Sequence, residues 1–288
     1  KAELLLEVQK AALRKEISAN YFGIQQNLGK IQLYKSIDSL YTILLKNATL
    51  RFEKGDLSQL DLLSIKARQH AIKLDLNNFE IQQQQLLQKL KLLMNYSDDF
   101  TVSTMPEVLP LPPDSLPANA YYQLLLLQDK TSEAQLKIEK NKLLPDFSLN
   151  YFVGTNNYQN SKYYHGFEVG LAMPLIFGGQ QAQKKSSEIA LNAQQLLTQN
   201  EVARLKNRWY ELKKETLKYS DQITYYNETG KLLYEEILRA TAINLQSGET
   251  DLFKFTYNFE TAVQIKIDYL DNLLKYNTLL LELMYISN

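Results

Sequence analysis

A duplicated pattern around two glycines constrains the fold of this 288-residue chain most strongly. Gly55 and Gly248 lie 193 positions apart (248 − 55), and this one offset superposes apolar positions on both sides of the glycines without a gap. Upstream it pairs Tyr41 with Tyr234, and downstream it pairs mainly isoleucines, leucines and phenylalanines. Chance matches between two amphipathic helices would not readily continue across a matched turn. The chain is therefore predicted to contain two copies of one helix–turn–helix unit.

Four long segments have helical periodicity, namely residues 1–52, 57–96, 180–245 and 250–286. Two stripes repeat every seven residues in the second of them: Ile65, Ile72, Phe79, Leu86 and Leu93, and separately Leu60, Ala67, Leu74 and Ile81. Heptads are typical of coiled-coil packing, and two stripes on one helix predict neighbours on two sides, as in a wall of helices. A helix over residues 180–245 would be about 100 Å long, which one chain cannot easily cover. The alternative is a self-contained antiparallel four-helix bundle.

The order of elements divides the chain into three regions. Residues 1–96 form the first helical hairpin, and residues 97–117 form an extended connector that holds five of the seven prolines. Residues 118–288 form the second repeat, which is predicted to contain a short helix, a β-hairpin at about residues 145–174 and a long helical hairpin. The predicted fold class is mainly α, internally duplicated, with one β-hairpin.

Residues 147–153 and 167–173 alternate apolar and other side chains in the manner of β-strands. Such alternation fits an outer-membrane barrel, with apolar residues toward lipid and polar residues toward the lumen. The lipid-facing candidates are Phe147, Leu149, Tyr151, Phe167, Val169 and Leu171, and Glu168 is the lumen-facing candidate. One hairpin cannot close a barrel, so further strands would have to complete it. The alternative is a soluble hairpin that packs on the helices.

Composition excludes several other functions. Lys and Arg equal Asp and Glu at 32 each, which leaves no basic surface for nucleic acid. There is no cysteine, and the two histidines, His70 and His165, belong to no cluster with metal-ligand spacing. No apolar run reaches the roughly 18 to 20 residues of a membrane-spanning helix. We therefore expect no enzyme activity, no catalytic residue, no metal and no cofactor.

Several motifs resemble the outer-membrane efflux protein family, the TolC-like ducts. They are residues 144–149, residues 169–179 before a long helix rich in Ala and Gln, and the glycine turn of residues 51–63, with a looser second turn at residues 247–253. The order helix, glycine turn, helix, proline connector, strand, strand, helix, glycine turn, helix is also similar, and it covers nearly the whole chain.

The resemblance implies a homotrimer in the outer membrane and periplasm of a Gram-negative bacterium. In the family, strands from three subunits form a β-barrel in the outer-membrane lipid and long helices form an α-barrel across the periplasm. The glycine turns lie at the periplasmic tip, which meets an adaptor (membrane fusion) protein and an inner-membrane pump. The expected function is the exit duct of a tripartite efflux or type I secretion system. The alternatives are a soluble periplasmic coiled-coil adaptor or scaffold, and a duct-like domain of a larger pump fusion.

The chain departs from the family pattern in one respect. Family members have a strand pair before each glycine hairpin, whereas here only the second copy has one. Gly179 precedes Gly248 by 69 positions, and the same distance before Gly55 falls at position −14 (55 − 69). We therefore expect the first strand pair to lie upstream of residue 1, in a longer protein.

The two glycine turns hold the candidate gate and adaptor-contact residues. These are Gly55, Asp56, Asp61, Gly248, Glu249, Asp251 and Lys254. Repeated by threefold symmetry, the carboxylates would form a ring that favours cations. The alternative role for Asp56 and Asp251 is helix capping in the first turn. Lys254 stands where family members often carry an acid, which weakens the ring hypothesis.

Overall fold

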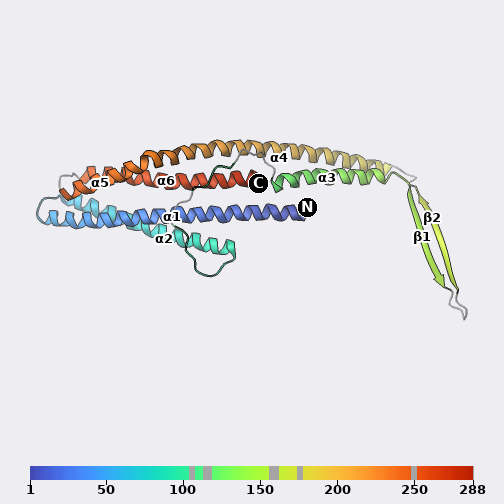
Figure 1. The fold of residues 1–288 in the computed structure, drawn as a ribbon, viewed down its shortest axis with the longest axis horizontal. Coiled ribbons are helices and arrows are strands. Elements are labelled where there is room, and N and C mark those ends of the chain that lie inside the picture. The colour runs from blue at the N-terminus through green and yellow to red at the C-terminus, as the bar shows by residue number, and fades with distance from the viewer. Residues whose placement is uncertain (104–107, 113–118, 156–161, 174–177, 248–251, 288) are drawn as a thin grey trace. The chain divides into compact units, whose positions relative to one another are not determined.

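The computed structural model describes the chain except residues 104–107, 113–118, 156–161, 174–177, 248–251 and 288 (Figure 1). The described residues form α1 (Ala2–Glu53), α2 (Gln59–Met94), α3 (Ala120–Asn141), β1 (Asp146–Thr155), β2 (Tyr163–Ala172), α4 (Gly178–Tyr225), the π-helical turn η1 (Tyr226–Gly230), α5 (Lys231–Ser247) and α6 (Leu252–Ser287). The predicted class, mainly α with one β-hairpin, is confirmed. The helix predicted over residues 180–245 is divided by η1 into α4 and α5.

The helices and strands belong to two compact units. The first unit consists of residues 1–5 and 120–205, and the second of residues 6–119 and 206–288. The second unit therefore combines α1 and α2 with α5, α6 and the end of α4, so that the helical hairpins of both predicted repeats pack in one body. The division into residues 1–96, 97–117 and 118–288 describes a duplication, and it stays a prediction.

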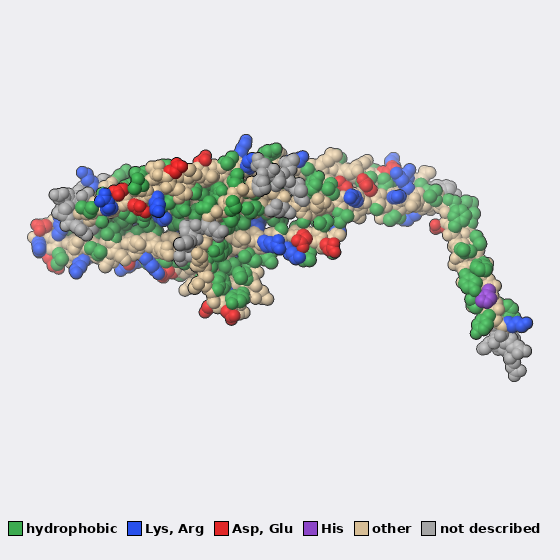
Figure 2. Space-filling model, viewed as in Figure 1, with side chains coloured by type: hydrophobic (Ala, Val, Ile, Leu, Met, Phe, Trp, Pro, Cys, Tyr) green, Lys and Arg blue, Asp and Glu red, His purple; other side chains and the backbone are tan. Residues whose placement is uncertain are grey.

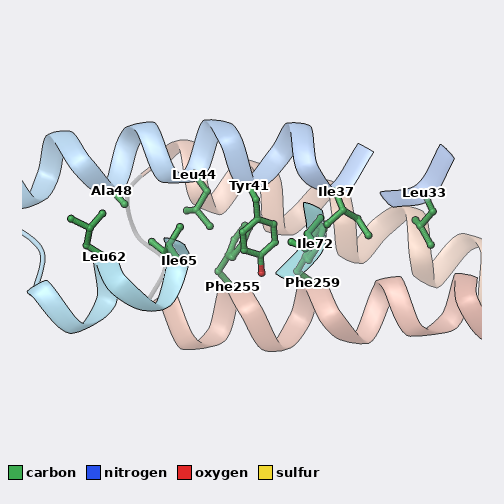
Figure 3. Packing of buried hydrophobic residues seen from close by; sticks show 10 residues of the cluster. All are labelled: Leu33, Ile37, Tyr41, Leu44, Ala48, Leu62, Ile65, Ile72, Phe255 and Phe259. Atoms are coloured by element: carbon green, nitrogen blue, oxygen red, sulfur yellow. The ribbon is translucent and has the colours of Figure 1, made fainter. Parts of the chain in front are cut away.

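The core of the second unit lies between α1, α2 and α6 (Figure 3). Ten buried residues form this core cluster: Leu33, Ile37, Tyr41, Leu44, Ala48, Leu62, Ile65, Ile72, Phe255 and Phe259. Tyr41 meets Phe255 and Phe259 edge-on, with ring centroids 6.2 and 5.6 Å apart. Ile65 and Ile72 belong to the first predicted heptad stripe of α2. This stripe therefore faces the core, as coiled-coil packing requires.

Buried amide side chains fix the register of α1 against α2. Asn27, which is 1% exposed, donates from Nδ2 to the Phe79 carbonyl and to Gln83 Oε1, at 2.8 Å each. Farther along the pair, Asn20 Nδ2 donates to the Leu86 carbonyl at 2.9 Å. A buried amide is stable only when it is paired, so a shift of either helix would leave these groups without partners.

The described part of the proline-rich connector lies against helices of the second unit. The Leu109 N–H donates to Asn277 Oδ1, and the Tyr276 hydroxyl donates to the Leu109 carbonyl, both at 3.1 Å. At the other end, Gln25 Nε2 donates to the Ser103 carbonyl at 3.4 Å. Residues 97–103 and 108–112 contain no helix or strand, as predicted for an extended connector.

In the sequence of α6, Lys266 interrupts a stripe of apolar residues at heptad spacing, Leu252, Phe259, Leu273 and Leu280, and the structure gives the reason. Its Nζ donates to the Tyr226 hydroxyl at 3.0 Å and lies 5.0 Å from the ring centroids of both Tyr226 and Tyr269. The two rings stack with centroids 3.8 Å apart. Burial lowers the pKa of Lys266, and the nearby Lys231 lowers it further while Glu235 raises it. Cation–π contact and the hydroxyl stabilise a charge where an apolar residue was expected.

In the first unit, α3 packs against α4 and the strand pair follows. Thr198 Oγ1 donates to Asp129 Oδ1 at 2.7 Å across the two helices. Glu139, near the end of α3, is 3% exposed and accepts from Lys142 Nζ at 2.8 Å. This ion pair satisfies a buried carboxylate just before the chain enters β1.

The buried amide of Asn27 provides a test of the register. Asn27→Ala leaves Gln83 without its buried donor, so we expect the free energy of unfolding to fall by about 1–3 kcal/mol. Urea unfolding followed by circular dichroism measures the change. Asn47→Ala, on the exposed face of α1, is the matched control and is expected to stay within about 0.5 kcal/mol of the parent. Equal effects of the two substitutions would contradict the register role.

Candidate functional site

The register of the strand pair places all six lipid-facing candidates on one face. The antiparallel pairing sets Phe147 opposite Leu171, Leu149 opposite Val169 and Tyr151 opposite Phe167. Glu168 lies opposite Asn150, on the other face of the pair. Alternate residues of a strand point to opposite faces, so one register determines both the apolar and the polar face.

The apolar face of the hairpin is exposed in this chain. The six side chains are between 55% and 79% exposed, and every residue of β1 is exposed. In β2 only Gly166 and Gly170 are partly covered. Figure 2 shows apolar side chains along the strand pair. Their exposure does not favour the alternative of a hairpin that packs on the helices.

On the face that holds Glu168, two positions of β2 are glycines without a side chain. Gly166 lies opposite Phe152 and Gly170 lies opposite Ser148. A Cβ at Gly166 would collide with the Phe152 ring, and one at Gly170 would collide with Ser148 Oγ. The two glycines therefore let the side chains of β1 lie across the backbone of β2, beside Glu168.

The strands are longer than their alternation predicts. The predicted strand segments, residues 147–153 and 167–173, end too early on the side of the turn, because β1 continues to Thr155 and β2 begins at Tyr163. Backbone pairing continues where the side-chain pattern has already become polar and aromatic. Each strand has 10 residues, within the range of about 9–11 needed to cross the hydrocarbon core of a membrane. None of the described helices has an apolar stretch long enough to cross a membrane.

The two histidines lie in different units of the described structure, in β2 and in α2. His165 bonds through Nδ1 with the Tyr151 hydroxyl, and the two rings stack with centroids 5.9 Å apart. His70 is exposed on α2. Among the described residues, no group of three or more His, Cys, Asp or Glu side chains could hold a metal ion.

The first glycine turn ends α1 in a Schellman motif. Gly55 has φ +82°, its N–H donates to the Phe52 carbonyl at 2.9 Å, and the Asp56 N–H donates to the Arg51 carbonyl at 2.8 Å. These two bonds satisfy carbonyls that the helix end would otherwise leave unpaired. Glycine is favoured at this position because a Cβ is strained in the left-handed region.

The acidic residues of this turn have different roles. Ser58 is the N-cap of α2 and accepts from the Asp61 N–H at 3.1 Å, while its hydroxyl donates to Asp61 Oδ2 at 2.7 Å. The predicted first-turn position of Asp56 is wrong, because Asp56 lies before the N-cap and belongs to the end of α1. Asp61 is the residue that stabilises the helix start. Asp56 is exposed and remains available to a partner or an ion.

The second glycine turn cannot be compared directly. Gly248, Glu249 and Asp251 lie outside the described residues, and Lys254 is exposed on α6. The structure thus places Asp56 and Asp61 at one turn, and the four-carboxylate ring stays a prediction.

Two helices carry exposed apolar residues at heptad spacing. On α2 these are the members of the second predicted stripe, Leu60, Ala67, Leu74 and Ile81. On α4 they are Ile189, Leu196, Tyr210 and Leu217, separated by 7 or 14 positions. The α4 set was missed from the sequence, although its spacing could have revealed it. An exposed stripe with coiled-coil spacing is typical of a helix that packs against another chain.

Comparison with solved structures identifies the fold. A membrane protein from Pseudomonas aeruginosa matches with a TM-score of 0.86 at 14% identity, over 99% of this chain and 70% of that one. The outer membrane protein VceC from Vibrio cholerae matches with 0.85 at 12% identity, over 100% and 72%. The open MtrE outer membrane channel from Neisseria gonorrhoeae matches with 0.71 at 14%, over 96% and 68%. No family model and no curated protein matches the sequence.

The chain therefore has the fold of the TolC-like outer-membrane channels, and the resemblance stated from the sequence is confirmed for the fold. Identity of 12 to 15% establishes a shared fold and nothing finer. The three structures named above are longer than this chain, which spans about 70% of their length.

The first glycine turn can be tested by a pair of alanine substitutions. Gly55→Ala forces a Cβ into the left-handed region, so we expect the free energy of unfolding to fall by about 1–2 kcal/mol. Gly23→Ala, inside α1, meets only Leu86 Cδ2 at 3.8 Å and is expected to raise that free energy by about 0.5–1 kcal/mol. Urea unfolding measures both, and shifts of the same sign would contradict the assigned turn geometry.

Proposed function

We propose that this chain is a subunit of a homotrimeric outer-membrane channel, the exit duct of a tripartite efflux or type I secretion system. The observation that carries the proposal is the TolC-like fold, which extends over nearly the whole chain. VceC is described as an outer membrane protein and MtrE as an outer membrane channel. A duct supplies a path and catalyses no reaction.

The strand pair is the proposed membrane contact. Its exposed apolar face would lie in outer-membrane lipid, and the face with Glu168 would line the lumen, because a charge is costly on the lipid side. An open sheet edge cannot remain in hydrocarbon, so the hairpin must pair with further strands. The described residues of three copies would supply six strands (3 × 2), and the remaining strands of a closed barrel would have to come from elsewhere. A soluble adaptor or scaffold would not benefit from an exposed apolar face, which favours aggregation in water.

The exposed heptad stripes support assembly from several copies. Leu60 is 74% exposed and Leu74 is 54% exposed on α2, opposite the buried stripe that holds Ile65 and Ile72. Burial of each such leucine against a neighbouring copy would contribute about 1.5–3 kcal/mol. In the trimer these faces would join helices of adjacent subunits into the wall of an α-barrel.

The first glycine turn is the proposed periplasmic tip. Here the duct would meet a periplasmic adaptor protein and an inner-membrane pump. Asp56 and Asp61, with Glu249 and Asp251 of the second turn, would supply a carboxylate ring at the entrance. Repetition in three subunits would concentrate negative potential and favour cations.

Insertion of the strand pair can be tested with a tryptophan reporter. Leu149→Trp places the indole on the apolar face, so its fluorescence is expected to shift to the blue in liposomes because the ring leaves water. Ser148→Trp, on the opposite face, is the matched control and should keep a more water-like spectrum. Subtracting the parent spectrum removes the signal of the native Trp209. A water-like spectrum from Leu149→Trp would contradict the lipid-facing assignment.

Conductance tests the duct and its entrance. In a planar bilayer the protein is expected to give discrete conductance steps with a preference for cations. The double variant Glu249→Ala/Asp251→Ala should reduce that preference, because it removes two carboxylates per subunit. Glu228→Ala, an exposed acid in η1, is the control and should leave the preference unchanged. An unchanged preference in the double variant would contradict the ring, and an absence of steps would contradict the duct.

A further inference from the structure

Five lysines lie close to the points where the strand pair joins its two helices. We call them the lysine cluster, and they are Lys137, Lys140, Lys142, Lys184 and Lys185. The first three lie in the last two turns of α3 or directly after that helix, and the other two lie in the second turn of α4. The two groups are 42 positions apart in the sequence (184 − 142), so the fold and not a local run of charge brings them together.

The pairing of α3 with α4 sets both groups at one level. The chain enters the strand pair from α3 and leaves it into α4, so the two helices are antiparallel. The hydrogen bond between Thr198 and Asp129 aligns them. Lys142 lies 13 positions after Asp129 (142 − 129), and Lys185 lies 13 positions before Thr198 (198 − 185). At 1.5 Å per residue both lysines are about 20 Å from that hydrogen bond, on the side of the strand pair.

Charge is distributed unevenly along these two helices. Residues 137–146 and 178–188 hold five lysines and three acids, a net charge of +2 (5 − 3). The remaining parts of the two helices in the first unit, residues 120–136 and 189–205, hold two bases and three acids, a net charge of −1 (2 − 3). Figure 2 shows basic side chains over α3 and the beginning of α4, with acidic ones among them. The excess of positive charge is therefore confined to the end that joins the strand pair.

Three members of the lysine cluster have no acidic partner among the described residues. Lys142 pairs with the buried Glu139 at 2.8 Å, and Lys184 pairs with Glu188 at 3.7 Å. The other three, Lys137, Lys140 and Lys185, are exposed, and no ion pair is formed by them in the described part of the chain. Their ammonium groups are available to an anion outside the protein.

Exposed apolar side chains lie between the lysine cluster and the strands. Leu144 is 61% exposed just before β1, and Met173 is 57% exposed just after β2. Phe147, 79% exposed, begins the apolar face of the strand pair. A lysine beside such a surface can lay its methylene groups along apolar neighbours and extend its ammonium group toward a polar layer. Apolar contact and positive charge are thus adjacent, as they are at the edge of a lipid leaflet.

We propose that the lysine cluster binds the anionic headgroups of phospholipids in the leaflet that borders the helices. The inference rests on the proposed membrane contact of the strand pair. The apolar face of the pair supplies attraction to any lipid, whereas the lysines select for a negative surface. Lysines next to a membrane-inserted segment raise the affinity for anionic lipid by about fivefold each. The overall charge of the chain is balanced, so this selection comes from where the lysines lie.

The experiment measures by flotation how strongly the full chain partitions into lipid vesicles. One kind of vesicle contains phosphatidylcholine alone, and the other contains equal parts of phosphatidylcholine and phosphatidylglycerol. We expect stronger partitioning into the anionic vesicles, with a difference that shrinks as sodium chloride screens the attraction. Sodium phosphate at the same ionic strength should act like sodium chloride, because the partner is a charged lipid surface and not a single phosphate ion.

The triple variant Lys137→Gln/Lys140→Gln/Lys185→Gln removes the three unpaired charges. We expect the preference for anionic vesicles to fall by about fivefold for each lysine lost, with partitioning into neutral vesicles unchanged. The variant Lys137→Arg/Lys140→Arg/Lys185→Arg keeps the charge and should behave like the parent. Lys140 also lies where a positive charge stabilises the end of a helix. That role changes stability but not the ratio between the two kinds of vesicle.

A second triple variant, Lys206→Gln/Lys214→Gln/Lys218→Gln, is the matched control. It removes the same charge from exposed lysines of the same helix, α4. The nearest of them, Lys206, is 28 positions beyond Gly178 (206 − 178), about 42 Å along the helix. This variant should keep the preference of the parent for anionic vesicles.

The outcomes separate this proposal from that of the duct. Equal partitioning of the parent into both kinds of vesicle would overturn the lysine cluster as a lipid site and leave the membrane contact of the strand pair intact. An unchanged preference in the first glutamine variant, or an equal loss in both glutamine variants, would overturn it as well. Stronger competition by phosphate than by chloride would replace the lipid surface with a site for a free anion. Failure to partition into either kind of vesicle would contradict both proposals.

Discussion

The packing of α2 on α1 at heptad spacing is the interaction on which the rest of the structure depends. Ile65 and Ile72 occupy the core with Tyr41, while Asn27 permits only one register by pairing with Phe79 and Gln83. Helices of 52 and 36 residues have more flank than one chain can cover, so the opposite stripe of α2 stays exposed. One face of α2 thus packs in the core of its own chain, and the other face exposes an apolar stripe. Burial of that stripe against another copy of the chain is a physical reason for the helices to assemble side by side.

The strand pair likewise has two faces with different side chains. A single antiparallel register collects the six lipid-facing candidates on one side and leaves Asn150 and Glu168, with Phe152, on the other. A shift by one residue would place the charge among the apolar residues. Glycine at positions 166 and 170 matters here because it lets Phe152 and Ser148 lie across the neighbouring strand. The two faces of the hairpin therefore differ in polarity.

Much of the fold follows from periodicity, which the sequence displays directly. The heptads, the alternating strands and the glycine turn at Gly55 were all predictable, since each follows from local backbone preference and one apolar face. The N-cap of α2 was harder to predict. Both Asp56 and Ser58 are residue types that cap helices, and only the geometry shows that Ser58 is the cap. Tyr226 in the π-helical turn stacks on Tyr269 of α6, a distant segment, and the strands end where their backbones stop pairing. No local sequence pattern reports either of these.

Corresponding positions of the two predicted repeats lie in different environments. Lys73 and Lys266 correspond at the offset of 193 (266 − 73), yet Lys73 is exposed and Lys266 is half-buried. The counterparts of Tyr226 and Tyr269 in the first copy are Leu33 and Leu76 (226 − 193 and 269 − 193), which offer an ammonium group neither a ring face nor a hydroxyl. Ile37, at the position of Gly230, instead fills the core of the first copy. Different side chains at a few packing positions therefore allow one lysine to be half-buried and leave its counterpart exposed, while both predicted repeats keep their heptad spacing.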